Sequence, residues 1–221
     1  TEYSPEELYV RKHIIEKKPD IVVNVLDASN LDRNLFLTTQ LIDMDIKVVI
    51  ALNMFDELKD KDIDFRYDDF GNMIGIPVVP TIASKGTGIK ELIQRIIRVY
   101  EDADPSVRHI HINYGSEIEN AIKGIQSVIW ENPSIGDRLS SRFLAIKLLE
   151  QDNETRRFLS QYNNYNEIIA EAEKRIEALE KEYSEQSETI IMDAKYGFID
   201  GALKETRTQQ NKKPKRQIRK L

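Results

Sequence analysis

The sequence has no cysteine, so it can form neither disulfides nor thiolate metal sites. It also has no run of about 18 or more apolar residues, which excludes a membrane-spanning helix. No charged and then apolar segment of the signal-peptide type opens the chain. Together these absences favour a reducing, cytoplasmic setting for the 221 residues.

Phosphate-binding elements are lacking as well. There is no G-x-x-x-x-G-K-[ST] loop, and no D-x-x-G is placed to hold a γ-phosphate and its magnesium. The chain begins at Thr1 in a polar segment that opens a helix. We therefore expect it to be an internal piece of a larger protein, and we assign no catalytic residue to it.

Charge is unevenly distributed along the chain, whose net charge is -6. Residues 206–221 carry seven basic side chains and no acid, so the remainder is more acidic than the total indicates. An acidic body argues against a nucleic-acid-binding surface. The basic segment is typical of a solvated linker or a membrane-proximal tail, and we expect residues beyond about 206 to be disordered in isolation.

The first half predicts an α/β arrangement. Apolar, β-branched runs at 21–26, 48–52 and 76–81 are typical of strands buried on both faces of a parallel sheet. Helical patterns lie before, between and after them, at 4–18, 33–45, 67–73 and 88–101. This alternation predicts βαβ units and a parallel sheet of three strands with flanking helices. Three strands are too few for a nucleotide-binding sheet, so with the guanine-reading pattern described below we interpret it as an incomplete P-loop GTPase-type sheet.

After Pro105 the spacing becomes purely helical, which predicts an all-α domain. We expect helices at 115–130, 135–149, 152–161, 164–185 and 187–200. The resulting division is an α/β part at 1–104, a helical domain at 113–203 and a basic tail at 204–221. The lone Trp130 is expected in the helical core, and Tyr162, Tyr165 and Tyr183 are expected to be partly buried.

Two loops carry the candidate chemistry. The second strand runs into Asn53, Met54 and Asp56, which place an N-x-x-D pattern at a carboxyl strand end, where open α/β sheets bind ligands. In this pattern the aspartate accepts from the guanine ring N–H and amine, an edge that adenine lacks. The third strand leads into residues 81–88, a loop placed to offer a backbone N–H to the guanine oxygen. An Asp that only caps a helix and a simple strand-to-helix turn are the alternatives.

A resemblance supports the nucleotide interpretation. Residues 19–35, 51–57 and 75–81, and then 135–138, 142–150 and 193–197, resemble the ferrous iron transport protein B (FeoB) family of bacteria. The likeness covers roughly residues 1–205. It implies that Asn53 and Asp56 read guanine, that Met54 replaces the lysine usual in other GTPases, and that Ala83 offers its backbone N–H. Ile82 and Ser84 depart from the serine and the basic residue common there.

The resemblance further implies GTP or GDP as the cofactor, with Mg²⁺ held in the complete domain by residues outside this chain. It identifies Thr1, Glu2, Tyr3 and Ser4 as the remnant of the second switch. The parent would be a GTPase at the cytoplasmic face of the bacterial inner membrane. Its own membrane domain, small accessory iron-transport proteins and a second copy paired through strand 21–27 are the expected partners.

Other interpretations stay open. The chain could be a helical interaction module on an α/β scaffold with no nucleotide, or a nucleic-acid-binding GTPase relative that uses its basic tail. His13, His109 and His111 could suggest a metal, but their distribution favours no metal site. Acidic helix faces at 150–190 could suggest an iron path, although such faces are usually just solvated.

Overall fold

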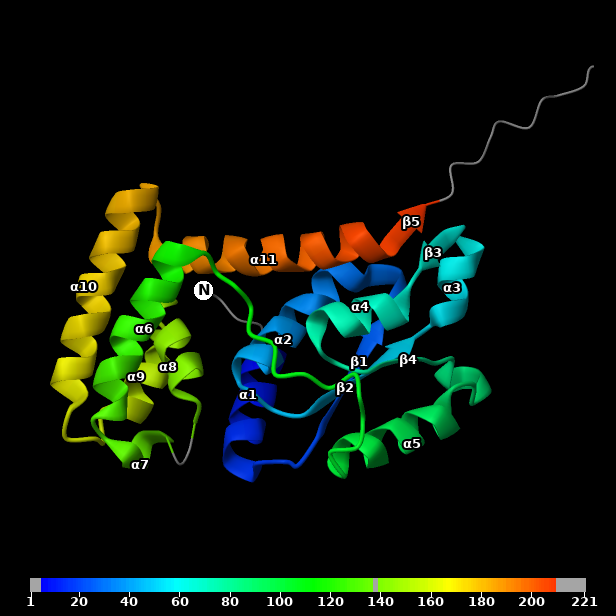
Figure 1. Cartoon of the computed structure of the whole chain (residues 1–221), viewed down its shortest axis with the longest axis horizontal. Coiled ribbons are helices and arrows are strands. Elements are labelled where there is room, and N and C mark those ends of the chain that lie inside the picture. The colour runs from blue at the N-terminus through cyan, green and yellow to red at the C-terminus, as the bar shows by residue number, and fades with distance from the viewer. Residues whose placement is uncertain (1–4, 137–138, 210–221) are drawn as a thin grey trace, which may run out of the picture.

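The computed structural model describes residues 5–136 and 139–209, which form an α/β part and a helical part joined by an extended linker (Figure 1). The elements of the α/β part, in chain order, are α1 (Pro5–Lys17), β1 (Val22–Asp27), η1 (Ala28–Asn30), α2 (Leu31–Asp43), β2 (Val48–Asn53), α3 (Phe55–Asp60), β3 (Ile63–Phe65), α4 (Tyr67–Ile74), β4 (Val78–Pro80), η2 (Ala83–Lys85) and α5 (Ile89–Tyr100).

The main sheet is parallel, with strand order β1-β2-β4. Val22 pairs with Val48 and Ile50 pairs with Val78, and all three strands run in the same direction. The central strand β2 is buried on both faces, as its uninterrupted apolar run predicts. All three strands therefore end on the same edge of the sheet, and this edge carries the candidate site.

Helices cover the two faces unequally. On one face α5 packs through Val99 against Val49 of β2 and Val79 of β4. On the same face of β1, however, Val23 and Val25 remain 38% and 64% exposed. Helices α2 and α4 lie on the opposite face (Figure 1). Strand β1 is an edge strand in the described part of the chain, as the sequence predicts for strand 21–27.

The helical part begins after the linker. Its elements are α6 (Ser116–Trp130), α7 (Pro133–Gly136), α8 (Ser141–Leu149), α9 (Asn153–Leu159), α10 (Tyr165–Tyr183) and α11 (Ser187–Thr206). Helix α11 is long enough to reach back over the α/β part, where it packs against α2 and α4 (Figure 1). It ends in β5 (Arg207–Gln209), which pairs antiparallel with β3 in a second, two-stranded sheet.

Several sequence-based expectations need correction. The stretch 135–149 is two helices rather than one, because α7 ends at Gly136 and α8 begins at Ser141. The last helix runs to Thr206 instead of 200, and Arg207–Gln209 form a paired strand, so the expected disorder beyond 206 is wrong for these residues. Helix α3 and strand β3 were not predicted. Both segments are short and contain charged residues, so tertiary pairing rather than a local sequence pattern defines them.

Aromatic burial was also partly mispredicted. Trp130 is 62% exposed at the end of α6, and Tyr183 is 45% exposed, whereas Tyr162 and Tyr165 pack against the core as expected. The α6 face that enters the core carries Ile118, Ile122, Ile125 and Ile129. Trp130 follows one residue later, which turns its side chain about 100° away from Ile129 around the helix axis. Within the described residues, no helix is long and apolar enough to span a bilayer.

Candidate functional site

The two predicted loops meet at the carboxyl edge of the sheet. Asn53 ends β2, and its Oδ1 accepts a hydrogen bond from the Ala83 backbone N–H at 2.9 Å. The Thr81 hydroxyl lies 3.4 Å from the same oxygen. Backbone bonds reinforce the contact, because Thr81 N–H donates to Leu52 and Phe55 N–H donates to Thr81. The Asn53 side chain thus ties the two loops together.

Asp56 lies in the first turn of α3, three residues after Asn53. Its Oδ2 forms an ion pair at 2.7 Å with Nζ of Lys85, the last residue of η2. The hydrogen bond from Lys85 lowers the pKa of the Asp56 carboxyl, and the same bond raises the pKa of Lys85. Asp56 is therefore an ionised acceptor. Lys85 was not among the predicted site residues, although it lies within the predicted 81–88 loop, one residue after Ser84.

The remaining predicted residues lie around this pair. Met54 has a positive φ of 57° and a side chain that is 41% exposed, so it stands at the surface between Asn53 and α3. Ile82 is half-buried and forms an isolated antiparallel bridge with Thr87. Ala83 and Ser84 are exposed. The predicted switch remnant, Thr1 to Ser4, lies outside the described residues.

Glycine shapes the second loop. Gly88, with φ of 79°, approaches the Pro80 carbonyl so closely that a Cβ at this position would lie 2.2 Å from that oxygen. Only glycine allows this turn between β4 and α5 without strain. By contrast, Asp68 and Gly71, which happen to be spaced as D-x-x-G, lie inside α4 and not at a strand end. They do not form a phosphate-binding turn.

The site's groups suit a guanine ring. An ionised carboxylate on α3 can accept both the ring N–H and the exocyclic amine, and a backbone N–H on the facing loop can donate to the ring oxygen. These two groups, Asp56 and the Ala83 N–H, are each hydrogen-bonded within the site, to Lys85 and Asn53. A base that binds here would replace Lys85 as the partner of Asp56, and it would replace Asn53 as the acceptor of the Ala83 N–H.

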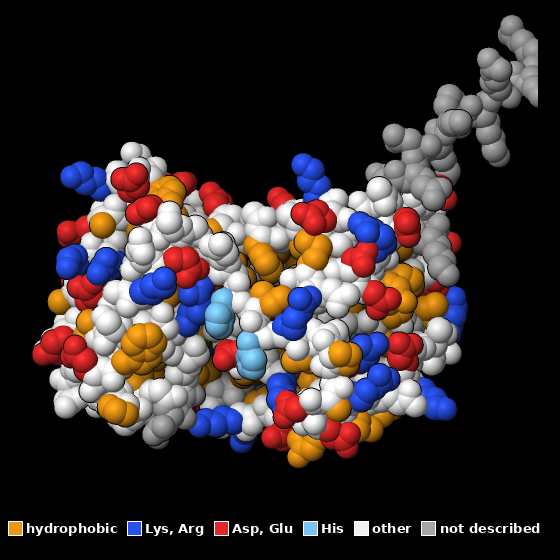
Figure 2. Space-filling view, in the orientation of Figure 1, with side chains coloured by type: hydrophobic (Ala, Val, Ile, Leu, Met, Phe, Trp, Pro, Cys, Tyr) orange, Lys and Arg blue, Asp and Glu red, His pale blue; other side chains and the backbone are white. Residues whose placement is uncertain are grey.

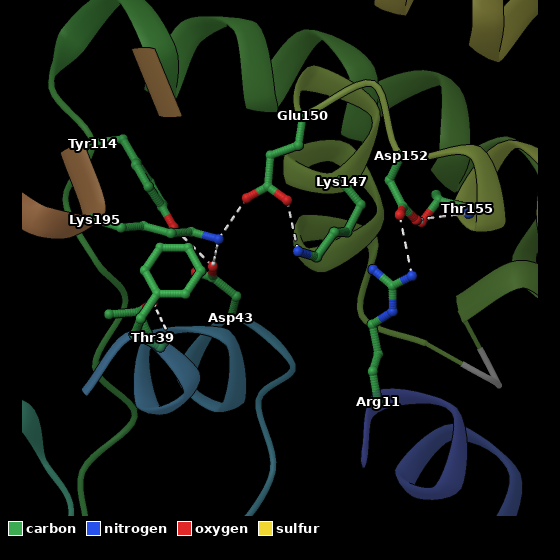
Figure 3. Close-up of polar contacts among 10 residues, drawn as sticks. Arg11, Thr39, Asp43, Tyr114, Lys147, Glu150, Asp152, Thr155 and Lys195 are labelled. Carbon is green, nitrogen blue, oxygen red and sulfur yellow. Dashed lines mark hydrogen bonds and ion pairs between the residues drawn. The ribbon is translucent and has the colours of Figure 1, made fainter. Parts of the chain in front are cut away.

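A second polar cluster joins the two parts of the chain (Figure 3). Lys195 of α11 contacts Glu150, directly after α8, at 2.5 Å and Asp43, the last residue of α2, at 3.2 Å. Glu150 also pairs with Lys147 at 2.6 Å, and the Tyr114 hydroxyl donates to Asp43 at 2.8 Å. All five side chains are buried. We call this set the interdomain charge cluster.

Burial and neighbouring charges shift the pKa values of the interdomain charge cluster in opposite directions. Burial lowers the pKa of Lys147 to about 8. Burial alone would also lower the pKa of Lys195, but Glu150 and Asp43 raise it instead. The Asp43 carboxyl has a raised pKa because it is buried, even though Lys195 and Tyr114 oppose the shift. No local pattern in the sequence indicates the cluster, because its members come from distant segments.

A further buried ion pair connects α1 to the helical part. Arg11 Nη2 lies 3.1 Å from Asp152 Oδ1, and Asp152 also caps α9 by accepting from the Thr155 N–H (Figure 3). Beside it a cavity of about 540 Å³ separates α1 from α8 and α9. Its apolar lining includes Ile15 and Phe143. Contacts from α1 and α2 therefore both reach the helical part.

The histidines do not meet at one point. His109 Nδ1 lies 3.2 Å from Asp45 Oδ1, His111 is exposed on the linker, and His13 stacks on Tyr9. Figure 2 shows two histidine side chains on the surface between the two parts. Across residues 5–136 and 139–209 no group of three or more His, Asp or Glu side chains is arranged to hold a metal ion.

Comparisons with known proteins agree with the geometry. The family model for ferrous iron transport protein B matches residues 1–96, and the model for the FeoB cytosolic helical domain matches residues 114–208. The crystal structure of a mutant of S. thermophilus NFeoB bound to GDP has a TM-score of 0.82 and 33% identity, covering 94% of this chain and 77% of that one. The structure of mGMPPNP-bound NFeoB from the same source gives a TM-score of 0.80 and 33% identity, with 95% and 76% covered.

Curated relatives point the same way. The Fe(2+) transport protein A/Fe(2+) transporter FeoB fusion protein of Porphyromonas gingivalis is 43% identical over 207 residues, which are 92% of this chain and 24% of that protein. The Fe(2+) transporter FeoB of Escherichia coli is 31% identical over 153 residues, 69% of this chain and 19% of the relative. The chain thus spans about a quarter or less of these relatives' length.

The fold and the matched neighbours define a class: part of a G-type α/β domain, followed by a helical domain. Its particular identity follows from the matches to both halves and to the solved structures. The chain belongs to the ferrous iron transport protein B (FeoB) family.

Proposed function

We propose that this chain recognises guanine and relays nucleotide state within a bacterial Fe²⁺ transporter. The observation that carries the proposal is the convergence of Asn53, Asp56 and the Ala83 N–H at the ends of two adjacent parallel strands. Structural neighbours bound to GDP and mGMPPNP support a guanine nucleotide as the ligand.

In this proposal each residue has a distinct task. Asp56 accepts from the guanine ring N–H and amine, and so excludes adenine, while the Ala83 N–H donates to the ring oxygen. Asn53 holds the second loop against β2 and approaches the other side of the base. Ile82, Ser84 and Met54 line the base. The phosphates and Mg²⁺ would be held by residues that precede Thr1 in a longer protein, and these would supply most of the affinity and the hydrolysis.

The relay runs through the contacts between the two parts. Helices α1 and α2 touch the helical part through Arg11–Asp152 and through the interdomain charge cluster. Packed elements with buried ion pairs shift as units, so a displacement of α1 or α2 would move α8 and α11. We propose that the transporter's membrane domain receives this displacement at the cytoplasmic face of the inner membrane, and that small accessory iron-transport proteins act alongside it.

The proposal is tested by nucleotide binding in the full-length protein. A fluorescent GDP analogue should bind, GTP and GDP should displace it, and ATP should not. The 221-residue chain should bind the analogue far more weakly and release no phosphate from GTP. If the full-length protein does not distinguish GTP from ATP, the α/β part is a scaffold for a helical interaction module, and the nucleotide proposal is wrong.

A further inference from the structure

The end of α11 is fastened to the α/β part by a short sheet. Strand β5 pairs antiparallel with β3, with Asp64 opposite Thr208 and Phe65 opposite Arg207. Next to the sheet the Arg66 N–H donates to the Thr206 carbonyl at 2.9 Å, and the Arg66 guanidinium donates to the Glu205 carbonyl. We call residues 63–66 and 205–209 the β3–β5 clasp.

The β3 side of the clasp directly follows α3, the helix that carries Asp56. Helix α3 ends at Asp60, and only a two-residue turn separates it from β3. Leu58 of α3 and Phe65 of β3 are both buried in the same core. In the described part of the chain, β3 pairs with β5 and with no other strand. The backbone partner that holds the far end of the α3–β3 segment is therefore the chain leaving α11.

The order of the elements gives this contact a functional meaning. Strand β5 directly follows α11, the last helix of the helical part, whereas β3 lies only a few residues after Asp56, the proposed guanine-reading carboxylate. We infer that the β3–β5 clasp positions α3, and that through it the chain leaving α11 controls how well Asp56 meets the base. Arg66 is a positioning residue in this scheme. The final step, from α3 to the base, rests on the proposed function.

Short elements make such control effective. A six-residue helix and a three-residue strand have little stability on their own, so their order depends on what they pair with. Local opening of α3 should follow the state of the clasp, while the main sheet stays closed. This coupling runs separately from the interdomain charge cluster, which meets α11 near its middle at Lys195.

The first test is hydrogen exchange in the 221-residue chain without nucleotide. Thr208→Pro removes a strand N–H and disfavours the ladder, and Thr208→Ala is the matched control at the same exposed position. We expect the amides of residues 55–60 to exchange at least about threefold faster in Thr208→Pro, with α5 unchanged. Equal exchange of residues 55–60 in the two variants would overturn the inference.

A crosslink provides the opposite perturbation and does not depend on the proline variant folding. Because the chain has no cysteine, Asp64→Cys with Thr208→Cys creates a single pair at directly opposed strand positions. The oxidised protein should show slower exchange at residues 55–60 than the same protein after reduction. No difference between the two redox states would contradict the clasp's control of α3.

The second test asks whether the clasp affects the base and not only the fold. In the full-length protein, the affinities for GDP and IDP are compared, since inosine lacks the amine that Asp56 would accept from. Thr208→Pro should reduce the preference for GDP at least about threefold relative to Thr208→Ala. Equal losses for both nucleotides would mean that the clasp is structural only. Absence of any GDP preference in the unmodified protein would refute the proposed function, while the exchange test would still decide the clasp.

Discussion

Lys195 of α11 lies 2.5 Å from Glu150 at the end of α8, and the two side chains are 0% and 4% exposed. Glu150 belongs to the helical part, while Asp43, the second acid that Lys195 contacts, belongs to α2 in the α/β part. One ammonium group thus links three elements of the chain. A charge buried this deeply is tolerated only because its partners are close.

Removing Lys195 should therefore destabilise the protein strongly. In Lys195→Met two buried carboxylates lose a counter-ion, which typically costs about 3–5 kcal/mol. Urea unfolding followed by circular dichroism measures the change. Lys204→Met, an exposed substitution on the same helix, is the control and should leave the midpoint nearly unchanged. A similar midpoint for both variants would show that Lys195 does not hold the two parts together.

Acid sensitivity should depend on Glu119, which anchors the linker. Its carboxylate accepts two hydrogen bonds from Arg142, which also holds the Ile112 carbonyl. Burial alone would raise the pKa of Glu119, but the hydrogen bonds and charge of Arg142 lower this pKa below the ordinary value of a glutamate. A lowered folded pKa adds stability above the unfolded value, and this stability is lost as the pH falls through the folded pKa.

The Glu119→Gln variant should consequently lose less stability on acidification. Below about pH 4.5, its urea midpoint should fall less steeply than that of the unmodified protein. Glu117→Gln, at an exposed position in the same turn, should retain the original pH dependence. Parallel curves for Glu119→Gln and the unmodified protein would rule out a role for this ion pair in acid unfolding.

Lys85 should compete with the base for Asp56. Exposed ion pairs are weak, so we expect Lys85→Met to tighten GDP binding by the full-length protein only about two- to fivefold. Lys85→Arg keeps the charge and should bind GDP as the unmodified protein does. Lys90→Met changes a nearby exposed lysine on α5 and serves as the control. Weaker binding by Lys85→Met would instead indicate that Lys85 contacts the nucleotide directly.

The open edge of β1 should cause self-association of the 221-residue chain. Natural edge strands are blocked by charge or proline, but β1 exposes Val23 and Val25 and is an edge strand among the residues that the structure describes. Light scattering should show dimers or larger species at high concentration, and Val25→Lys should restore the monomer. Tyr183→Lys, in the helical part, should not. A monomeric unmodified chain at high concentration would contradict this prediction.

The sequence predicted the parts of the fold that depend on local pattern. The runs at 21–26 and 48–52 became β1 and β2, as continuous β-branched residues predict. Only β2 is covered on both faces, however, because Val23 and Val25 leave one face of β1 exposed. The convergence of Asn53 with the loop after β4 was also predictable, because parallel strands end at one edge. Whether these residues read guanine stays a prediction.

Long-range contacts were not predictable in the same way. The pairing of β3 with β5 joins two very short segments that lie far apart in the sequence, and neither has a strong strand pattern. Lys195 and Glu150 look like ordinary helix residues in sequence, and only packing buries them. Trp130 was placed in the core by its residue type, although the helix turns it outward.

The most direct measurement of the central claim uses Asp56→Asn in the full-length protein. An amide can donate to the xanthine carbonyl at the position where the carboxylate accepted from guanine, so the base preference should invert. Competition against a fluorescent GDP analogue gives the affinities for GDP and XDP. We expect the variant to bind GDP more weakly and XDP more tightly, whereas unchanged GDP affinity would show that Asp56 only caps α3.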